Sequence, residues 1–588
     1  MAAHIGHSQK AKPLSPVSVT FLGTSSGGGP ILSRNCSSLA VDFGNEIWLF
    51  DAADGTLMRL HQSSLRIANI SRIFITHMHA DHTLGLVAIM MTIMSGVGVK
   101  PGENEELAKL GTKKKATFHI YGPAGIRKLI RTTLSVTSIN LAGVFAIHEI
   151  LEQGEEPSVD CEEENLHSNE AVGIDFIAND DGVWENILQQ GNGKSGKGWS
   201  VKAGPIHHRV PSLGYVLAEP VPRVQLDTSS LIPLLKSNAE ALASLDPPIK
   251  HPLSLLSHLT SLPPPPPYTL PSGDVIHPPP PSGISPRKLV IFGDCSGGTE
   301  NSTFQKMCEN PSLLVHECTN GHIPHDVQRG DKGMKIRKKD LEPSLEAKRD
   351  RLFFHKPTDG KKGHPHENGN GHHSFEDILA KDNEKRLEVQ KKALSRGHST
   401  PEEVGNFAKT IKARRVIVNH FSAMFPSPRY PSTEPFPSIL SPISPFPYPS
   451  PTSTPSNAHG YDPHVEPHSL TKNELHTRLI MQSLADQITE IWSPPADRDE
   501  DKIARMAIPS RDFMSIRIPS HELSDIEQDD IRRYREELDR VMGSWKECGG
   551  VWVDLPKEVG RIWLGVEPAP SIGGKTAPQE GNHIRYEE

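Results

Sequence analysis

The chain lacks the features that mark secreted and membrane proteins. Its 588 residues include only six cysteines, and none of them form a CxxC pair, which argues against a disulfide framework and predicts free thiols. No apolar run reaches the length of a membrane span, and the first residues, MAAHIGHSQKAKPLSPVSV, contain no apolar core of a signal peptide. We therefore expect an intracellular protein without a membrane partner, in the nucleus, the cytoplasm or the mitochondrion.

Apolar residues are also scarce, at 36%, whereas prolines number 52. This composition predicts one sizeable core and much chain outside it. Pro-rich or charged sequence predicts disordered, low-complexity insertions at about 221–287, 321–395 and 425–470, between a flexible N-terminus (1–16) and a C-terminal extension (521–588). The net charge of −8 excludes wholesale electrostatic wrapping of nucleic acid, although not a local basic patch.

Between the insertions, short apolar runs alternate with helical stretches. The runs that read as strands lie at 17–23, 37–43, 46–52, 70–76, 116–122, 288–294, 312–318 and 414–420. Helices are expected over TLGLVAIMMTIM, after the fourth run, and over GPAGIRKLIRTTL, after the fifth. This alternation indicates an α/β domain spanning 17–520.

Three histidines and an aspartate crowd into the sequence ITHMHADHTLGL, directly after one of these strands. His77 and His79, two positions apart in a turn, can converge on one cation, and Asp81 and His82 suit a second ion nearby. Imidazole and carboxylate are ligands that zinc prefers. The alternative is a polar loop with scattered histidines, which is how we interpret GHPHENGNGHH farther along the chain. The position after a buried strand favours a metal site, because a site needs rigid support.

Three distant residues at strand ends or sharp turns can complete such a site: His208, Asp294 and His420. Taken singly, an aspartate there is often a helix cap, and a lone histidine is more often structural. Together they allow His77, His79 and His208 to hold one ion, Asp81, His82 and His420 to hold the other, and Asp294 to bridge. At this stage His207 is an alternative to its neighbour His208.

The arrangement resembles the metallo-β-lactamase superfamily and, within it, ribonuclease Z, the endonuclease that trims the 3′ trailer from precursor tRNA. The stretches that carry the resemblance are FLGTSSGGGPILSRNCSS, LFDAADGT, THMHADH, HRVPSLGY and FGDCSGG. The resemblance implies an αββα sandwich, with two mixed sheets flanked by helices, and two zinc ions per active site. The register of HRVPSLGY selects His208 over His207.

Two further stretches point to ribonuclease Z in particular. LLVHECT resembles the family's HEAT motif and places Glu317, and GHST resembles its HST motif and places His398. The resemblance implies that this pair protonates the leaving oxygen, which makes physical sense because an imidazole held by a carboxylate is a poised general acid. GHST can also cap the following helix through Ser399 or Thr400, and both interpretations can hold together.

Other parts match the family less closely. HFSAMFPSPRY is an interrupted form of the family's HFSxRY and makes Ser422 and Arg429 candidate substrate-binding residues. The interval where the family carries its tRNA-gripping arm, 221–287, shows only a faint match. The resemblance also implies precursor tRNA as partner, and a homodimer is one state in which such family members occur.

The leading hypothesis is a zinc-dependent endoribonuclease that removes the 3′ trailer of precursor tRNA by attack of metal-activated water, with Asp81, Glu317 and His398 as catalytic residues. One rival is another hydrolase of the same fold, a cyclic-nucleotide phosphodiesterase or arylsulfatase, which has no need of the Glu317–His398 pair. A second rival is a non-catalytic RNA-binding or scaffold protein, against which the complete set of seven ligands counts.

Overall fold

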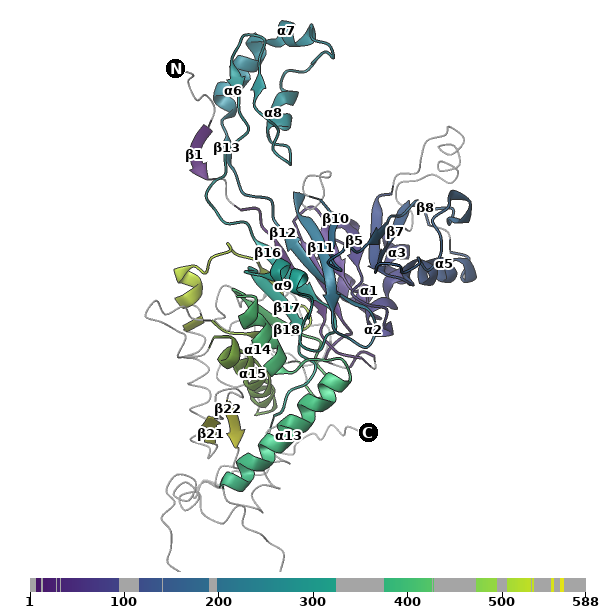
Figure 1. The fold of residues 1–588 in the computed structure, drawn as a ribbon, viewed down its shortest axis with the longest axis vertical. Helices are drawn as coiled ribbons and strands as arrows, with labels where there is room; N and C mark the ends of the chain where they lie inside the picture. The colour runs from purple at the N-terminus through teal and green to yellow at the C-terminus, as the bar shows by residue number, and fades with distance from the viewer. Residues whose placement is uncertain are drawn as a thin grey trace, which may run out of the picture.

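A computed structural model of the chain describes residues 7–11, 14–94, 116–189, 198–323, 375–425, 427, 472–493, 505–532, 551–554 and 561–564, except residues 28, 32, 140 and 530. Its strands form two large sheets that pack face to face, with helices on the outer side of each (Figure 1). The predicted αββα sandwich is confirmed.

The first sheet has the strand order β20-β2-β3-β4-β5-β6-β7-β8, with β9 beside β7. It is antiparallel from β20 to β4 and parallel from β4 onward. Its strands are β2 (Ser18–Gly23), β3 (Ser38–Asp42), β4 (Ile47–Phe50), β5 (Ile70–Phe74), β6 (Phe118–Pro123), β7 (Phe145–Leu151), β8 (Glu170–Ala171), β9 (Asp175–Ile177) and β20 (Ser515–Arg517). The helices that accompany this half are α1 (Thr56–Gln62), η1 (Ile67–Asn69), α2 (Ala80–Thr83), α3 (Leu86–Ile93), α5 (Ile126–Val136) and η2 (Glu163–Asn165).

The second sheet has the order β10-β11-β12-β16-β17-β18-β19 and becomes parallel from β16 onward. Its strands are β10 (Trp184–Leu188), β11 (Ser200–Ile206), β12 (Ser212–Ala218), β16 (Lys288–Phe292), β17 (Leu313–Glu317), β18 (Val416–Asn419) and β19 (Ile508–Pro509). The helices of this half are α9 (Ser302–Cys308), α13 (Phe375–Ser395), α14 (Pro401–Thr410) and α15 (Lys472–Trp492).

Large aromatic side chains from both sheets fill the space between them. The rings of Phe50 and Phe74 stack with centroids 5.1 Å apart, and Tyr215 of the second sheet meets Phe74 edge-on. The Tyr215 hydroxyl donates a 2.7 Å hydrogen bond to the backbone oxygen of Ile75. Each such side chain contributes roughly 2–3 kcal/mol through burial. The hydrogen bond also ties the second sheet to the segment that carries the histidine cluster.

Residues 221–287 differ from the expected low-complexity insertion. Most of them form a small helical unit that projects from the sandwich (Figure 1). Its elements are β13 (Val224–Leu226), α6 (Thr228–Ser237), α7 (Ala239–Ala243), α8 (Ser254–Leu259), β14 (Tyr268–Thr269) and β15 (Val275–Ile276). Leucines at helical spacing build a separate core that includes Leu231, Leu235, Leu255 and Leu259. We call residues 224–281 the arm.

Other expectations about the flanking segments are only partly addressed. The strand β1 (His7–Ala11), which pairs with β13, lies in the N-terminus that was expected to be flexible. Residues 324–374 and 428–471, the bulk of two predicted insertions, lie outside the described residues. In the C-terminal extension, β21 (Val551–Asp554) pairs with β22 (Arg561–Leu564). The described cysteines are free thiols, and none of the described helices combines the length and apolarity needed to cross a membrane.

A pair of buried histidines makes the first sheet sensitive to acid. His148 of β7 accepts a hydrogen bond from Ile174 N at Nδ1, and its Nε2 lies 3.1 Å from Nδ1 of His119 on β6. Burial, assisted by the charge of His119, lowers the pKa of His148 from 6.5 to about 3. Below pH 6.5 His148 therefore binds a proton in the unfolded chain but stays neutral in the folded chain, so the free energy of unfolding falls as the pH falls.

The His148→Gln variant tests this effect. Between pH 7.5 and 5 its free energy of unfolding should fall by about 2 kcal/mol less than that of the wild type, because glutamine does not titrate and the buried imidazole with its lowered pKa has been removed. Denaturant titrations at the two pH values measure the difference. His61→Gln, at an exposed histidine of α1, should keep the wild-type pH dependence. Equal pH dependence of all three proteins would contradict the assignment.

Candidate metal centre

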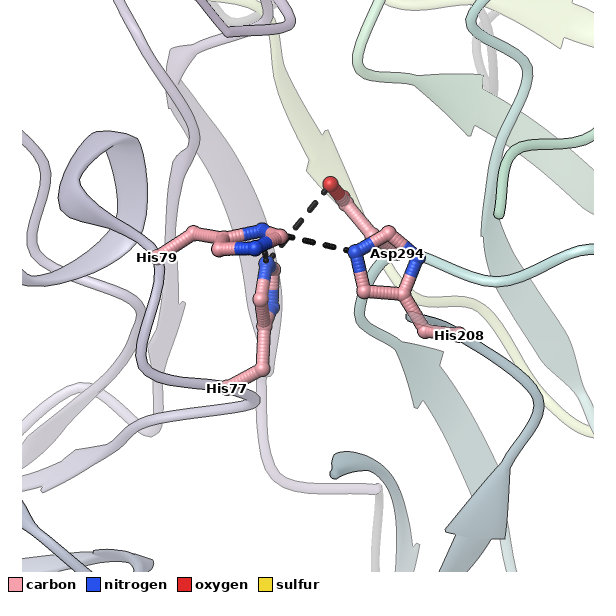
Figure 2. A group of neighbouring side chains, drawn as sticks. All are labelled: His77, His79, His208 and Asp294. Atoms are coloured by element: carbon pink, nitrogen blue, oxygen red, sulfur yellow. Dashed lines mark hydrogen bonds and ion pairs between the residues drawn. The ribbon is translucent and has the colours of Figure 1, made fainter. Parts of the chain in front are cut away.

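Four side chains from separate parts of the chain point toward one another at the edge between the sheets. Figure 2 shows His77, His79, His208 and Asp294 meeting there. His79 Nδ1 lies 2.9 Å from His77 Nε2 and 3.4 Å from His208 Nε2, and Asp294 Oδ2 lies 3.7 Å from His77 Nε2. One potential ligand atom from each residue falls within 4.8 Å of all the others, which is compact enough for a single cation.

A second group adjoins the first through Asp294. Asp81 Oδ2 lies 3.7 Å from His82 Nε2 and 3.6 Å from His420 Nε2. Asp294 Oδ1 approaches the same two nitrogens, at 3.4 and 3.2 Å, whereas its Oδ2 faces the first group. The two oxygens of one buried carboxylate are thus divided between two groups of ligand atoms, an arrangement suited to a pair of cations.

Hydrogen bonds orient the four histidines that present Nε2 to the centre. In each of them Nδ1 donates a hydrogen bond to an oxygen atom. Two of these oxygens are the hydroxyls of Thr76 and Thr319, which can only accept from the histidines because they donate their own hydrogens to carboxylates. The acceptors are Thr76 Oγ1 for His77 at 3.1 Å, Asp51 Oδ2 for His82 at 2.7 Å, Gly397 O for His208 at 2.6 Å and Thr319 Oγ1 for His420 at 2.9 Å. Such partners fix the tautomer and leave the Nε2 lone pair free for a metal.

Two of these nitrogens provide a test of fit for a metal. His82 Nε2 and His420 Nε2 are buried and have no hydrogen-bond partner among the described residues. A buried polar atom without a partner costs about 1–3 kcal/mol, and the nearest groups are carboxylates that offer no proton. A cation between these nitrogens and carboxylates removes the penalty, so the donor set fits a binuclear metal site of histidine and aspartate.

Most protonation states match this use, and His82 is the exception. Burial lowers the pKa of His82, but the charges of Asp294 and Asp51 and the hydrogen bond to Asp51 raise it well above its ordinary value, so a cation would displace its proton. Burial lowers the pKa of three of the imidazoles, those of His77, His79 and His208. Burial raises the pKa of the Asp81 carboxyl, but the neighbouring imidazoles of His420 and His82 lower it more. Asp294 is likewise held below its usual range, because the charges of neighbouring histidines exceed the effect of its burial. Neutral imidazoles and ionised carboxylates are the forms that bind cations.

Topology explains why residues so distant in sequence meet. His77, Asp294 and His420 each follow the carboxyl end of a strand, in turn β5, β16 and β18. β5 and β18 run parallel to both of their neighbours, and β16 runs parallel to β17. The carboxyl ends of parallel strands lie at one edge of a sheet, and the residues that follow them there form the site. His420 and Asp51 both adopt a left-handed backbone with φ 60°, a conformation that few non-glycine residues adopt.

The predicted Glu317–His398 pair lies beside this centre. His398 Nδ1 is 3.1 Å from Glu317 Oε1 and 3.8 Å from Asp294 Oδ2. Burial lowers the pKa of His398, but the hydrogen bond and charge of Glu317 and the charge of Asp294 raise it above its ordinary value. Glu317 is 1% exposed and also accepts bonds from the backbone nitrogens of Cys295, Thr319 and Ser399. A rigid carboxylate therefore holds a histidine in the form that can donate a proton.

The turn before His398 is shaped by a glycine and a helix cap. Gly397 has φ 78°, and a Cβ there would lie 2.5 Å from His208 Nδ1, so only glycine allows its carbonyl to hold that ring. Thr400 caps α14 in a capping box with Glu403. The cap and the site therefore share the GHST segment, as the sequence allowed.

The remaining predicted residues are placed as follows. His207 is exposed, outside the metal groups, with Nδ1 2.5 Å from Ser296 Oγ. Ser422 lies next to the centre in sequence, and its backbone nitrogen donates to Thr319 O. Arg429 lies outside the described residues. Sequence reasoning missed Asp51, which receives bonds from Thr76 and His82. The available signal was an aspartate ending a buried strand in LFDAADGT.

Comparisons with known proteins agree with this geometry. Residues 17–101 match the family model of the anti-Pycsar protein Apyc1. The zinc phosphodiesterase ELAC protein 1 of Bos taurus is 27% identical over 415 residues, which cover 69% of this chain and 86% of the relative. The ribonuclease Z of Prochlorococcus marinus (strain MIT 9312) is 29% identical over 305 residues, which cover 52% of this chain and 76% of the relative.

Among solved structures, that of human tRNase Z, short form (ELAC1), is 21% identical, covers 69% of this chain and 93% of that chain, and has a TM-score of 0.37. The sandwich of two mixed sheets, the paired histidine and aspartate groups and the sequence relatives lead to one assignment. The chain has the metallo-β-lactamase fold of a metal-dependent hydrolase, and its sequence is similar to those of the zinc phosphodiesterase ELAC protein 1 and ribonuclease Z.

Proposed function

We propose that this protein is a zinc-dependent endoribonuclease that removes the 3′ trailer from precursor tRNA. The observation that carries the proposal is the Glu317–His398 pair, 3.1 Å apart and next to Asp294. A hydrolase that expels a poor leaving group, such as a ribose oxygen, needs a proton donor. The relatives named ribonuclease Z and zinc phosphodiesterase support the same chemistry.

Seven residues would hold two zinc ions in this proposal: His77, His79 and His208 for one, Asp81, His82 and His420 for the other, with Asp294 shared. When bound, the ions supply Lewis-acid chemistry, lowering the pKa of water and offsetting charge on phosphoryl oxygens. The choice of zinc follows from the nitrogen and oxygen donors and from the name of the ELAC relatives.

The protein side chains move the protons. A water oxygen attacks phosphorus as the bond to the 3′ oxygen breaks, and Asp81, which is ionised and only 16% exposed, accepts the proton of that water. His398, held by Glu317, gives its proton to the departing 3′ oxygen. The products are a 3′ hydroxyl on the tRNA and a 5′ phosphate on the trailer. Each proton transfer contributes typically 10²–10⁴-fold to the rate.

One assay tests the proposal directly. Zinc-loaded protein is incubated with a precursor tRNA, with cyclic nucleotides and with small phosphodiester and sulfate esters. Cleavage just after the discriminator nucleotide, lost in Asp81→Ala, is the expected result. Turnover of small esters without RNA cleavage would refute the assignment to tRNA.

A cyclic-nucleotide phosphodiesterase is the second candidate, and the match to the Apyc1 family model over residues 17–101 is the observation in its favour. That region contains the HxHxDH motif. The matched region ends before His208, Asp294, Glu317 and His398. It therefore supports the metal ligands of the HxHxDH motif but gives no information on the proton donor. The same assay separates the two candidates through the cyclic nucleotides.

The arm gives a second prediction about RNA. Ser282 N donates to Pro222 O at 2.8 Å, so the two ends of the arm meet and residues 224–280 can be replaced by a short Gly-Ser linker. We expect the shortened protein to cut precursor tRNA at least about 100-fold less efficiently, because RNA is gripped over a large area by shape and backbone contacts.

Hydrolysis of bis(p-nitrophenyl) phosphate, which is too small to reach the arm, should stay within about threefold of the wild type. Comparing kcat/KM for the two substrates measures the effect. Undiminished RNA cleavage, or an equal loss on both substrates, would contradict a role of the arm in RNA binding.

A further inference from the structure

A hollow of about 420 Å³ lies beside the metal centre, with His208 in its wall. Its apolar lining includes Ile150, Trp184 and Leu213, all of which are 4% exposed or less. The Trp184 indole is fixed by a 2.9 Å hydrogen bond from Nε1 to Leu151 O. A rigid apolar hollow of this size suits a flat ring system, and the shared residue His208 places the hollow next to the metal centre.

The rim of the hollow carries one guanidinium, that of Arg209. Arg209 is exposed, and no ion-pair partner for it occurs within the described part of the chain. An arginine left unneutralised next to a catalytic site is available for phosphate, which its planar fork binds through two parallel hydrogen bonds.

Three carboxylates, those of Glu152, Glu155 and Glu300, also line the hollow. Glu152 and Glu300 are exposed lining residues, and the backbone of Thr299 is fixed near them because its hydroxyl donates to Pro205 O at 2.7 Å. Carboxylates repel phosphate but accept hydrogen bonds from the amino groups of nucleobases. The hollow therefore has a guanidinium that suits an anion, carboxylates that suit amino groups, and apolar lining.

We propose that this hollow is a nucleotide subsite: it takes the base of one of the two nucleotides that flank the scissile bond, while Arg209 binds the adjoining phosphate. The inference rests on the proposed phosphodiesterase function and adds a specificity site to it. Bases with an exocyclic amino group, adenine, cytosine and guanine, bind there better than uracil. Arg209 acts on binding of the substrate and not on proton transfer.

Kinetics with precursor tRNA test the subsite. Arg209→Gln should raise KM about tenfold and leave kcat within about threefold, and Arg209→Lys should fall between it and the wild type. The matched control is Arg66→Gln, the same change at an exposed arginine before β5, at the end of that strand away from the site. Its KM should equal that of the wild type. An Arg209→Gln protein that matches Arg66→Gln would overturn the proposal.

Modified substrates test the base without changing the protein. A precursor tRNA with one abasic nucleotide, placed either just before or just after the scissile bond, should raise KM severalfold at one of the two positions and so identify the bound nucleotide. In Val210→Trp, where a larger side chain of the lining fills the hollow, that abasic penalty should disappear. Unchanged KM at both positions would refute the base site.

The subsite and the proposed function can fail separately. If the wild type cuts no precursor tRNA, the assignment to tRNA fails, and the subsite is then measured with p-nitrophenyl esters of adenosine and uridine monophosphates against bis(p-nitrophenyl) phosphate. A lower KM for the adenosine ester than for the uridine ester, with the difference lost in Val210→Trp, supports the subsite. Equal KM values for all three esters would overturn it.

Discussion

The Asp294→Asn variant is expected to retain at most one zinc ion per chain and to hydrolyse phosphodiesters at least about 10³-fold more slowly, ~4 kcal/mol on the barrier. Asp294 is 2% exposed and directs Oδ1 toward His82 and His420 and Oδ2 toward His77. An amide keeps the shape but loses the charge and one of the two acceptors. Because this side chain serves both groups of ligands, one substitution weakens both sites.

Zinc content by elemental analysis and initial rates with precursor tRNA and a small diester measure the two effects together. Glu219→Gln is the control, since Glu219 is a buried carboxylate that pairs with Arg287 and not with the centre. It should lower stability and keep two zinc ions. An Asp294→Asn protein with two ions and wild-type rates would remove Asp294 from the metal centre.

The sandwich and the set of metal-ligating residues could be predicted because each is marked by a short stretch of sequence. His77, Asp294 and His420 follow short apolar runs directly, and parallel strands bring such positions to one edge. The chemistry then restricts the residue types, since imidazole and carboxylate are what a binuclear zinc site uses. The structure brings all seven predicted metal-ligating residues and the Glu317–His398 pair together within one region.

Some strands were not predicted because their sequences contain polar residues, glycine or proline, which are unusual in buried strands. The tertiary contacts that allow these residues there cannot be read from the sequence. β7 is buried along its whole length, yet it contains His148 and Glu149, which are satisfied by His119 and Arg127. β11 contains Gly204 and Pro205, residues that normally argue against a strand. Gly204 is required there, because a Cβ would lie 2.1 Å from the ring of Phe304.

The arm was hidden by its composition. Proline runs such as LPPPPPYTLP dominate residues 262–283, and short helices with one or two leucines per turn give a weak periodic signal. Leu231, Leu235 and Leu259 form a core only because α6 and α8 fold against each other. The hydrogen-bond partners of the histidines were harder to infer. An aspartate that ends a buried strand makes Asp51 a candidate, but the local sequence of Asp51 or Thr319 does not indicate which imidazole each contacts.

The His398→Ala variant is expected to lower kcat for precursor tRNA by about 10²–10⁴-fold while zinc content and KM stay close to wild-type values. The imidazole is 14% exposed, and its Nδ1 is hydrogen-bonded to Glu317. Burial lowers its pKa, but the hydrogen bond and charge of Glu317 and the charge of Asp294 raise the pKa above its ordinary value. It is thus placed and protonated to serve the leaving oxygen. Without this imidazole, water can still attack the phosphorus, but the leaving 3′ alkoxide receives no proton.

A substrate with a better leaving group separates this role from a structural one. p-Nitrophenolate departs without protonation, so His398→Ala should lose less than about tenfold on bis(p-nitrophenyl) phosphate. Glu317→Gln should show the same contrast at smaller amplitude, since it acts by positioning His398, and His61→Ala should show none. Because His398 Nδ1 also lies 3.8 Å from Asp294 Oδ2, loss of zinc in His398→Ala, with equal losses on both substrates, would make His398 a ligand and leave the proton donor to be found elsewhere.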